Sequence, residues 1–411
     1  MLSLSYHSHI IKSAQAWASL TSIVPSCDWR PPCLFAPRSA ATPASRGVSY
    51  PHVMAVTPRR TYARISRHPR SFPATMEYVR LGQSGLKVSR IILGCMSFGS
   101  REWMNWLTEE EEALELIHHA YQSGINTWDT ADVYSNGQSE QIVGKALKKY
   151  NIPRERVVIM SKVFFAVGDD NAPTFSATND GEFVNRLGLS RKHIIDAVEA
   201  SVKRLGTYID VLQIHRLDHE TPKEEIMRAL NDVVERGWVR YIGASSMAAW
   251  QFQQLQHVAE KHGWHQFISM QNLYNLLYRE EEREMIPYCH DTGVGLVPWY
   301  PLASGLLTRP LGEMSTERSQ TDRFRTAFQG TSEADKTIIK RLEEVAKNKG
   351  VSMAQVALAW LLSKKDVSPI VGLSKKHRID EAVAAVKIHL TGDEIKYLEE
   401  PYLPRPVRGY S

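Results

Sequence analysis

The sequence has 411 residues, with 50 Lys and Arg against 45 Asp and Glu and a hydrophobic share of 43%. These values are ordinary for a globular protein and exclude a collagen-like, coiled-coil or wholly disordered chain. No apolar run reaches the roughly 18 to 20 residues that a membrane-spanning helix needs. The four cysteines, at positions 27, 33, 95 and 289, are too few and too scattered for a disulfide framework or a zinc site. We therefore expect a reducing, cytoplasmic setting, no membrane partner and no metal.

The net charge of +5 is unevenly distributed. Residues 1–75 contain nine Lys and Arg and a single acid, Asp28, and carry +8, which leaves −3 for residues 76–411. Proteins that bind nucleic acids depend largely on neutralising phosphates, so a mildly acidic body argues against that class of partner. The function is expected to reside in residues 76–411.

Residues 1–75 are rich in Ser, Pro, Ala and Arg and show no helical or strand periodicity. We predict a disordered basic leader, for which three interpretations stay open. It is an upstream extension of the gene model, with Met76 or Met54 as the working start, a mitochondrial transit peptide, or a functional tail. The first 29 residues contain one Lys and no Arg, which gives little support to the amphipathic basic helix of a transit peptide.

From Met76 onward the pattern changes. Two short apolar stretches flank Gly82–Gly85 and predict a β-hairpin. β-rich runs then alternate with amphipathic helical stretches eight times. The predicted strands are Ile91–Cys95, Asn126–Ala131, Val157–Val163, Ile209–Leu217, Val239–Ser245, Phe267–Gln271, Gly295–Trp299 and Pro369–Leu373. Near-continuously apolar strands separated by helices indicate a parallel sheet covered by helices, and eight such units favour a (β/α)8 barrel, the TIM-barrel fold.

Local signals place the ends of several helices. Thr108 with Glu111 matches a capping box, and Gly124 lies where that helix is expected to stop. Ser190 is predicted to cap the helix that follows it. Thr221 is predicted as an N-cap with Pro222 in the first helical position. No Gly-x-Gly-x-x-Gly fingerprint follows the first strand, which argues against an open dinucleotide-binding sheet.

Two stretches are longer than the loops that a minimal (β/α)8 barrel needs. Residues 164–189 follow the third strand and residues 306–330 follow the seventh, both on the side where βα loops build a barrel's active site. Long loops in this position are often lids or substrate walls.

Four chemically capable side chains come at or just after consecutive strand ends: Asp129, Tyr134, Lys162 and His215. Each has a structural alternative, because Asp129 could cap a helix, Lys162 could form a rim ion pair and His215 could be a core residue. Together they suit carbonyl reduction, in which hydride addition creates an alkoxide that must be protonated as it forms. Lys162 is expected to favour the phenolate of Tyr134 and so make it a better acid near neutral pH, with Asp129 as the partner of the lysine. His215 is expected to orient the carbonyl oxygen.

The remaining strand ends offer groups that suit a nicotinamide cofactor. Ser245, Ser246 and Gln271 can hydrogen-bond a carboxamide, and Trp299 can stack on a flat ring. At the last strand–helix junction, Ser374, Lys375 and Arg378 suit a phosphate monoester.

Residues 77 to about 400 resemble an aldo-keto reductase. The resemblance rests on Leu93–Gly99, Gly124–Tyr134, Leu212–Arg216, Tyr241–Ser246 and Gln271–Leu277, which are spread over the whole body of the chain. It is strongest to fungal members of the versiconal hemiacetal acetate reductase and aryl-alcohol dehydrogenase type, with potassium-channel β subunits as more distant kin.

This resemblance implies a catalytic tetrad of Asp129, Tyr134, Lys162 and His215 and an NADPH bound across the barrel mouth. Ser245, Ser246 and Gln271 would hold the carboxamide, and Trp299 would stack on the nicotinamide. The other implied cofactor contacts are Tyr300, Pro301, Leu302, Ser374, Arg378 and Glu381.

Some positions depart from the wider family. Ser246 replaces a common Asn, Tyr300 replaces a usual Ser, and Ala382 replaces a common Asn near the adenine. Gly372 stands where some members have a phosphate-binding Lys, which leaves Lys375 and Arg378 for that task.

The prediction is therefore an NADPH-dependent reductase of an aldehyde, ketone or hemiacetal-masked carbonyl in secondary metabolism. Trp103, Trp106 and Tyr300 favour an aromatic substrate, either aryl or polyketide-like. The rival is a cofactor-sensing regulatory subunit like the channel β subunits. The sequence does not predict an oligomeric state.

Overall fold

The computed structural model describes residues 76–410 except 176, 314–320 and 322–331. Its core is an eight-stranded, all-parallel sheet in the order β10-β3-β4-β5-β6-β7-β8-β9. The strands are β3 (Ile92–Gly94), β4 (Thr127–Asp129), β5 (Val158–Val163), β6 (Ile209–Ile214), β7 (Val239–Ser245), β8 (Phe267–Gln271), β9 (Gly295–Leu296) and β10 (Ile370–Gly372). The predicted (β/α)8 barrel is confirmed.

Backbone hydrogen bonds close the sheet into a barrel between its first and last strands. Leu296 N–H donates to Asp366 O at 3.0 Å, and Ser368 N–H donates to Leu296 O at 2.9 Å. Ile370 N–H donates to Pro298 O at 3.0 Å. The strands therefore leave no open edge at which another chain could pair.

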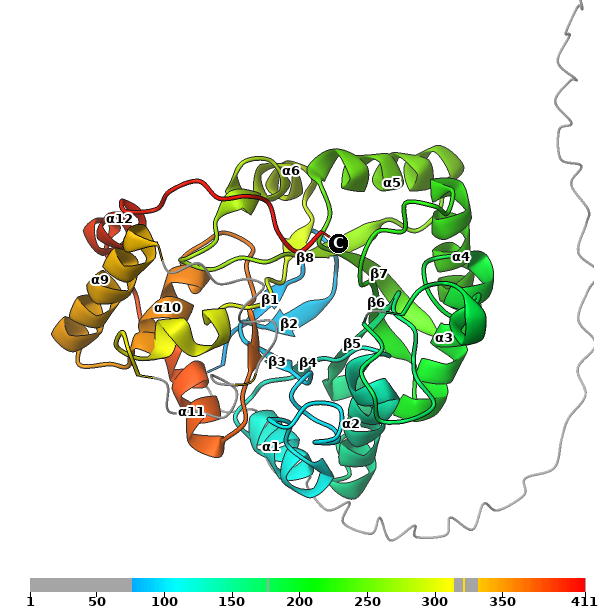
Figure 1. Cartoon of the computed structure of the whole chain (residues 1–411), viewed down its shortest axis with the longest axis horizontal. Coiled ribbons are helices and arrows are strands. Elements are labelled where there is room, and N and C mark those ends of the chain that lie inside the picture. Colours follow the sequence, from blue (N-terminus) through cyan, green and yellow to red (C-terminus); the bar gives the residue numbers. More distant parts are fainter. Residues whose placement is uncertain (1–75, 176, 314–320, 322–331, 411) are drawn as a thin grey trace, which may run out of the picture. The chain divides into compact units, whose positions relative to one another are not determined.

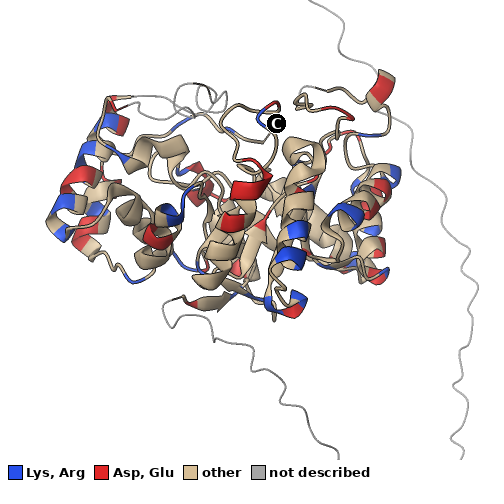
Figure 2. Ribbon diagram, turned by 90° about the horizontal axis from the view of Figure 1, so that it is seen from below, with Lys and Arg blue, Asp and Glu red and all other residues tan. Residues whose placement is uncertain are grey.

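Helices surround the strands, as Figure 1 shows. Each strand is followed by one of them: α1 (Glu110–Gln122), α2 (Gln138–Lys149), α3 (Arg191–Leu205), α4 (Lys223–Glu235), α5 (Ala249–His262), α6 (Met285–Thr292), α10 (Met353–Leu362) and α11 (Lys376–Ala385). Two more, α9 (Glu333–Lys349) and α12 (Gly392–Glu399), lie outside α10. Acidic and basic residues are interspersed along the helices (Figure 2), and no helix in the described part of the chain is long and apolar enough to cross a membrane.

The predicted hairpin forms from β1 (Tyr78–Arg80) and β2 (Lys87–Ser89), which pair antiparallel. It packs on the start of β9, where Gln83 N–H donates to Gly293 O at 2.7 Å. A Cβ on Gly82 would lie 2.3 Å from Gly293 O, so only glycine fits this approach. Leu81 and Val88 of the hairpin region join an apolar cluster with barrel residues including Ile92, Val158, Met160, Val211, Val297 and Ile370. The hairpin and these apolar side chains therefore close this end of the barrel.

Two predicted helix starts are wrong. Helix α1 begins with Glu109 as its N-cap and no side-chain cap, because Thr108 instead forms a β-bridge with Phe98. The N-cap of α4 is Pro222 rather than Thr221, whose hydroxyl donates to Asp218 Oδ2 at 2.7 Å. The cap at Ser190 is confirmed, since its Oγ accepts from His193 N–H at 3.2 Å.

Cys95 is fully buried among apolar side chains, as expected for a small core residue. The predicted leader at residues 1–75 and most of the second long loop, residues 306–330, lie outside the described residues. The first long loop, residues 164–189, contains one short 3-10 helix, Gly181–Phe183.

Replacing Gly144 with alanine should destabilise the barrel. A Cβ at this position in α2 would lie 2.3 Å from Leu205 O at the end of α3, and neither backbone can yield easily. We expect the free energy of unfolding to fall by about 1–3 kcal/mol, measured by urea denaturation. Gly392→Ala is the matched control, because nothing lies within 4 Å of a Cβ there. Equal stability of the two variants would contradict this packing.

Candidate active site

Lys162 lies inside the barrel with no exposed surface and forms an ion pair with Asp129. Its Nζ donates to Asp129 Oδ1 at 2.5 Å, to Thr130 O at 2.9 Å and to Tyr134 OH at 3.3 Å. Burial alone lowers the pKa of Lys162, but the Asp129 carboxylate and the Tyr134 hydroxyl raise it more, so its net pKa is above the ordinary value. Lys162 is therefore a permanent cation whose three donors are all in use.

The second oxygen of Asp129 is held by two amides. Gln213 Nε2 and Gln271 Nε2 each donate to Asp129 Oδ2 at 3.0 Å, and Gln271 Nε2 also lies 2.9 Å from Gln213 Oε1. Sequence reasoning missed the role of Gln213. Strand alternation could have found it, because Val211, Gln213 and His215 lie on one face of β6 at a period of two.

Tyr134 follows β4 and is placed by a turn with unusual backbone angles. Ser135 and Asn136 have φ of 50° and 48°, and Gly137 has φ of 89°. Two non-glycine residues in the left-handed region carry a conformational cost, and Ser135 Oγ offsets part of it by accepting from Ser100 N–H at 2.8 Å. The turn leaves the Tyr134 ring 93% buried with its hydroxyl beside Lys162.

Burial raises the pKa of Tyr134, and the Lys162 cation offsets only part of this effect. The net pKa therefore lies above its ordinary value, not below it as expected, although Lys162 acts in the expected direction. In this structure Tyr134 holds its proton throughout the neutral range.

His215 is neutral in this environment. Burial lowers its pKa well below the ordinary value, and the nearby cations Lys162 and Arg216 lower it further. Its ring packs edge-on against Tyr134 at 5.8 Å and against Phe165 at 5.0 Å between ring centres. The Nδ1 atom is buried without a hydrogen-bond partner in the described part of the chain, which favours the tautomer with the proton on Nε2.

Aromatic side chains from two loops gather beside Tyr134. Trp103 and Phe175 lie 5.2 Å apart between ring centres, and Phe175 lies 5.4 Å from Phe165. Trp106 packs against the same cluster. The first long loop therefore supplies an aromatic wall next to the tetrad.

The predicted carboxamide contacts meet at the ends of β7 and β8. Ser245 Oγ donates to Gln271 O at 2.9 Å, and Ser246 Oγ lies 3.2 Å from Ser245 Oγ. Trp299 Nε1 donates to Ser246 Oγ at 3.0 Å. Ser246 thus helps to fix the orientation of the Trp299 indole.

The segment after Trp299 turns sharply. Tyr300 has φ of 64°, and its carbonyl oxygen accepts from Asn275 Nδ2 at 2.9 Å. Pro301 is buried, and Leu302 precedes a 3-10 helix, Ala303–Thr308. The predicted cofactor contacts Tyr300, Pro301 and Leu302 therefore directly follow Trp299 in the sequence.

The predicted adenosine contacts lie at the start of α11. Arg378 Nη1 donates to Ser374 Oγ at 3.1 Å, and both side chains are partly exposed. Glu381 follows one turn later on the same helix. The N-cap of α11, Lys375, makes no side-chain cap, so N–H groups at the start of this helix can donate hydrogen bonds to an anion.

The C-terminal segment returns to the candidate site (red trace in Figure 1). Tyr402 OH donates to Glu280 Oε1 at 2.6 Å, and Arg405 N–H donates to the same oxygen at 2.8 Å. Gly409, with φ of 86°, lies close to Trp299. A Cβ added to Gly409 would be 3.1 Å from Cζ2 of the Trp299 ring. The sequence predicts that this tail, residues 401–411, is one of the segments that set substrate identity, but it does not predict these contacts.

The C-terminal segment is also held in place by hydrogen bonds to the buried carboxyl group of Glu281. Tyr410 OH donates to both oxygens of Glu281, at 3.0 and 3.1 Å, and Asn272 Nδ2 donates to Glu281 Oε2 at 2.9 Å. Burial raises the pKa of Glu281 to about 7 from 4.5, although both hydrogen bonds act against the rise.

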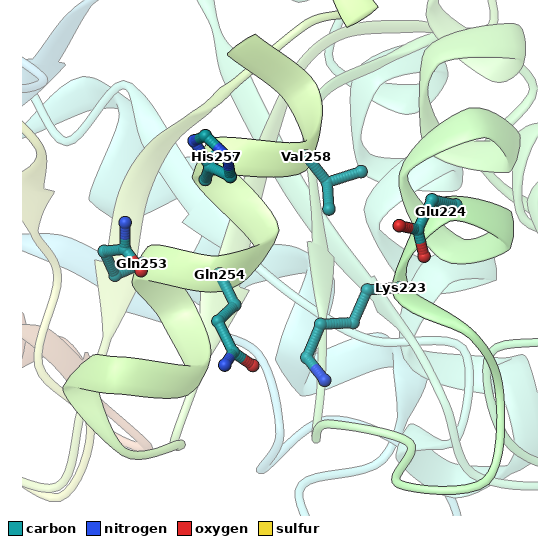
Figure 3. A pocket seen from close by; sticks show the side chains of 6 residues that line it. All are labelled: Lys223, Glu224, Gln253, Gln254, His257 and Val258. Atoms are coloured by element: carbon teal, nitrogen blue, oxygen red, sulfur yellow. The ribbon is translucent and has the colours of Figure 1, made fainter. Parts of the chain in front are cut away.

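Figure 3 shows a hollow of about 340 Å³ elsewhere on the chain. Its lining comes from α4 and α5: Lys223, Glu224, Gln253, Gln254, His257 and Val258. It contains none of the predicted site residues.

The raised pKa of Glu281 predicts a pH-dependent stability. The folded state keeps a proton that the unfolded chain releases above pH 4.5, so the contribution of Glu281 to stability should fall between about pH 4.5 and 7 and then level off. The Tm of Glu281→Gln relative to wild type should therefore rise over this interval, measured at half-unit steps of pH. Glu284→Gln, at an exposed position nearby, is the control. A Tm slope that Glu281→Gln leaves intact would contradict the assignment.

Comparison with known proteins shows to which family this chain belongs. A model of the "Aldo/keto reductase family" matches residues 90–402. A versiconal hemiacetal acetate reductase of Aspergillus parasiticus is 64% identical over 338 residues, covering 81% of this chain and 98% of that protein. A candidate aryl-alcohol dehydrogenase of Schizosaccharomyces pombe is 57% identical over 343 residues, covering 81% and 97%. An aldo-keto reductase of Fusarium vanettenii is 49% identical over 347 residues, covering 82% and 94%. With the barrel and the matched residues in agreement, the chain belongs to the aldo/keto reductase family of oxidoreductases.

Proposed function

We propose that this protein is an NADPH-dependent reductase that converts an aldehyde, ketone or hemiacetal-masked carbonyl into an alcohol, with Tyr134 as the general acid. The observation that carries the proposal is the buried chain from Asp129 through Lys162 to the Tyr134 hydroxyl, with distances of 2.5 and 3.3 Å. A cation in contact with a phenol stabilises the phenolate that forms when the phenol gives up its proton.

The proton moves from Tyr134 OH to the carbonyl oxygen as negative charge develops there. The phenolate that remains is stabilised by the Lys162 cation, which already points at it. Asp129 balances the charge of Lys162 before the reaction, so Lys162 is not an isolated cation in the resting state.

His215 serves as a second donor to the same oxygen. Because its pKa lies well below the ordinary value, it is a neutral imidazole that can donate one hydrogen bond without competing as an acid. Its edge-on packing against Tyr134 and Phe165 fixes the ring plane.

The residues present fit a nicotinamide dinucleotide. Gln271 Nε2 is committed to Asp129 and Gln213, which leaves Gln271 Oε1 to accept from a carboxamide. Asn272 Oδ1 is a buried acceptor without a partner in the described residues. Trp299 would face the ring, Ser245 and Ser246 would border it, and Ser374, Lys375 and Arg378 would hold the 2′-phosphate that distinguishes NADPH from NADH. When bound, the reduced cofactor supplies the hydride.

The substrate is proposed to be an aryl or polyketide-like carbonyl of secondary metabolism. The wall of Trp103, Phe165 and Phe175 beside Tyr134 supports a flat aromatic substrate. The names of the relatives, a versiconal hemiacetal acetate reductase and a candidate aryl-alcohol dehydrogenase, support the same class.

NADPH consumption by the full chain with benzaldehyde tests this function. Tyr134→Phe should lower kcat by about 10²- to 10⁴-fold, the usual contribution of a general acid. Tyr397→Phe is the matched control, because that hydroxyl bonds Glu344 on the outer helices. NADH should be used less efficiently than NADPH.

Steady turnover that Tyr134→Phe leaves unchanged would contradict the role of this residue. Tight NADPH binding without turnover of any aldehyde in an aryl and aliphatic panel would favour the cofactor-sensing regulatory subunit instead.

The Lys162–Asp129 ion pair predicts that a double variant can regain stability without regaining activity. Asp129→Asn leaves Lys162 as a buried, uncompensated cation and should cost about 3–5 kcal/mol of unfolding free energy. Adding Lys162→Met should restore most of this stability but no activity, measured by urea denaturation beside NADPH turnover. If the double variant is as active as wild type, the proposed mechanism is wrong.

A further inference from the structure

Arg216 follows His215 at the end of β6 and is a cation in the wall of the candidate active site. Its Cζ lies 6.0 Å from the centre of the Phe165 ring and 5.9 Å from that of Trp299. The Phe165 ring also packs against His215 at 5.0 Å. The guanidinium group therefore lies between the aromatic wall and the indole proposed to face the cofactor.

Within the described part of the chain, Arg216 has no carboxylate partner. Its Nη1 donates to the backbone oxygen of His215 at 2.6 Å, and its Nε is buried without a hydrogen-bond partner. Burial lowers the pKa of Arg216 to about 10, as expected for a cation withdrawn from water without a counter-ion.

Two other largely buried arginines of this barrel are paired. Arg154 Nη2 lies 2.5 Å from Asp210 Oδ2, and Arg204 Nε lies 2.7 Å from Glu140 Oε2. Buried guanidinium groups are generally compensated in this way because desolvation is costly. Arg216 lacks such compensation at the one place where a ligand would be expected to bind.

We propose that Arg216 binds an anionic oxygen group of the substrate, a carboxylate or phenolate on an aromatic carbonyl compound, and so determines substrate specificity. The proposal rests on the proposed reductase function. A planar guanidinium flanked by rings presents its N–H groups in one plane, which suits the two oxygens of a carboxylate. Trp103 Nε1, buried and unpartnered among the described residues, is a second donor in the neighbouring aromatic cluster.

Arg216→Gln tests this with paired substrates. The three carboxybenzaldehyde isomers are compared with the three methylbenzaldehydes, so that shape is matched and charge differs. For at least one isomer, the ratio of kcat/KM for the charged over the neutral aldehyde should fall about 10- to 100-fold in Arg216→Gln, mainly through KM. Arg216→Lys should keep part of the preference. Arg240→Gln, an exposed arginine stacked on Tyr208, is the control.

The phosphates of NADPH offer the same anionic chemistry, so the dissociation constant of NADPH is measured in parallel by fluorescence quenching. A loss confined to NADPH affinity, or equal losses for charged and neutral aldehydes, would overturn the proposal. If wild type reduces none of the aldehydes, the reductase proposal fails by itself. Calorimetric binding of 4-methylbenzoate to the NADP⁺ complex then decides on Arg216: affinity lost in Arg216→Gln supports the site, and equal or absent binding rejects it.

Discussion

The structure of the active end of this barrel depends on the buried ion pair between Lys162 and Asp129. A lysine with no exposed surface is tolerated only when its charge is balanced and its donors are satisfied. Asp129 provides the charge, and the amides of Gln213 and Gln271 occupy its other oxygen. This network joins the ends of β4, β5, β6 and β8. The opposite end is filled by apolar side chains and the β1–β2 hairpin, so polar and apolar layers divide the barrel along its axis.

The position of Tyr134 beside Lys162 carries both a conformational and an electrostatic cost. Its hydroxyl lies beside Lys162, and the two residues that directly follow it, Ser135 and Asn136, adopt left-handed backbone angles. Burial then raises the pKa of the phenol more than Lys162 lowers it. In the resting state the cation therefore does not remove the proton. In the mechanism proposed above, its stabilising effect would be largest on the phenolate formed as the proton leaves, which is where a catalyst gains most from preorganised charge.

The sequence predicts the barrel well because buried parallel strands are apolar runs with alternating faces. The bounds of β7 and β8 agree with the predicted strands, and the pairing of Lys162 with Asp129 follows from the need to compensate a buried charge. Local patterns fail where a tertiary contact competes for the same atoms, as with Thr108 in its bridge to Phe98. Gln213 was missed because a neutral amide in an apolar run has no signal of its own until its partners are known.

Contacts distant in sequence are the least predictable, and Trp299 is where they meet. Its indole N–H is held by Ser246 from β7, the Arg216 guanidinium lies beside its ring from β6, and Gly409 packs on its edge from the C-terminal segment. That segment is in turn fastened through Tyr410 to Glu281, 129 residues earlier in the chain. A serine at position 246 is small enough to leave room for the indole and still accepts its hydrogen bond, which a purely apolar residue would not do. The orientation of one ring thus couples the proposed cofactor side, the proposed anion site and the C-terminal segment, so changes in any of the three should alter the other two.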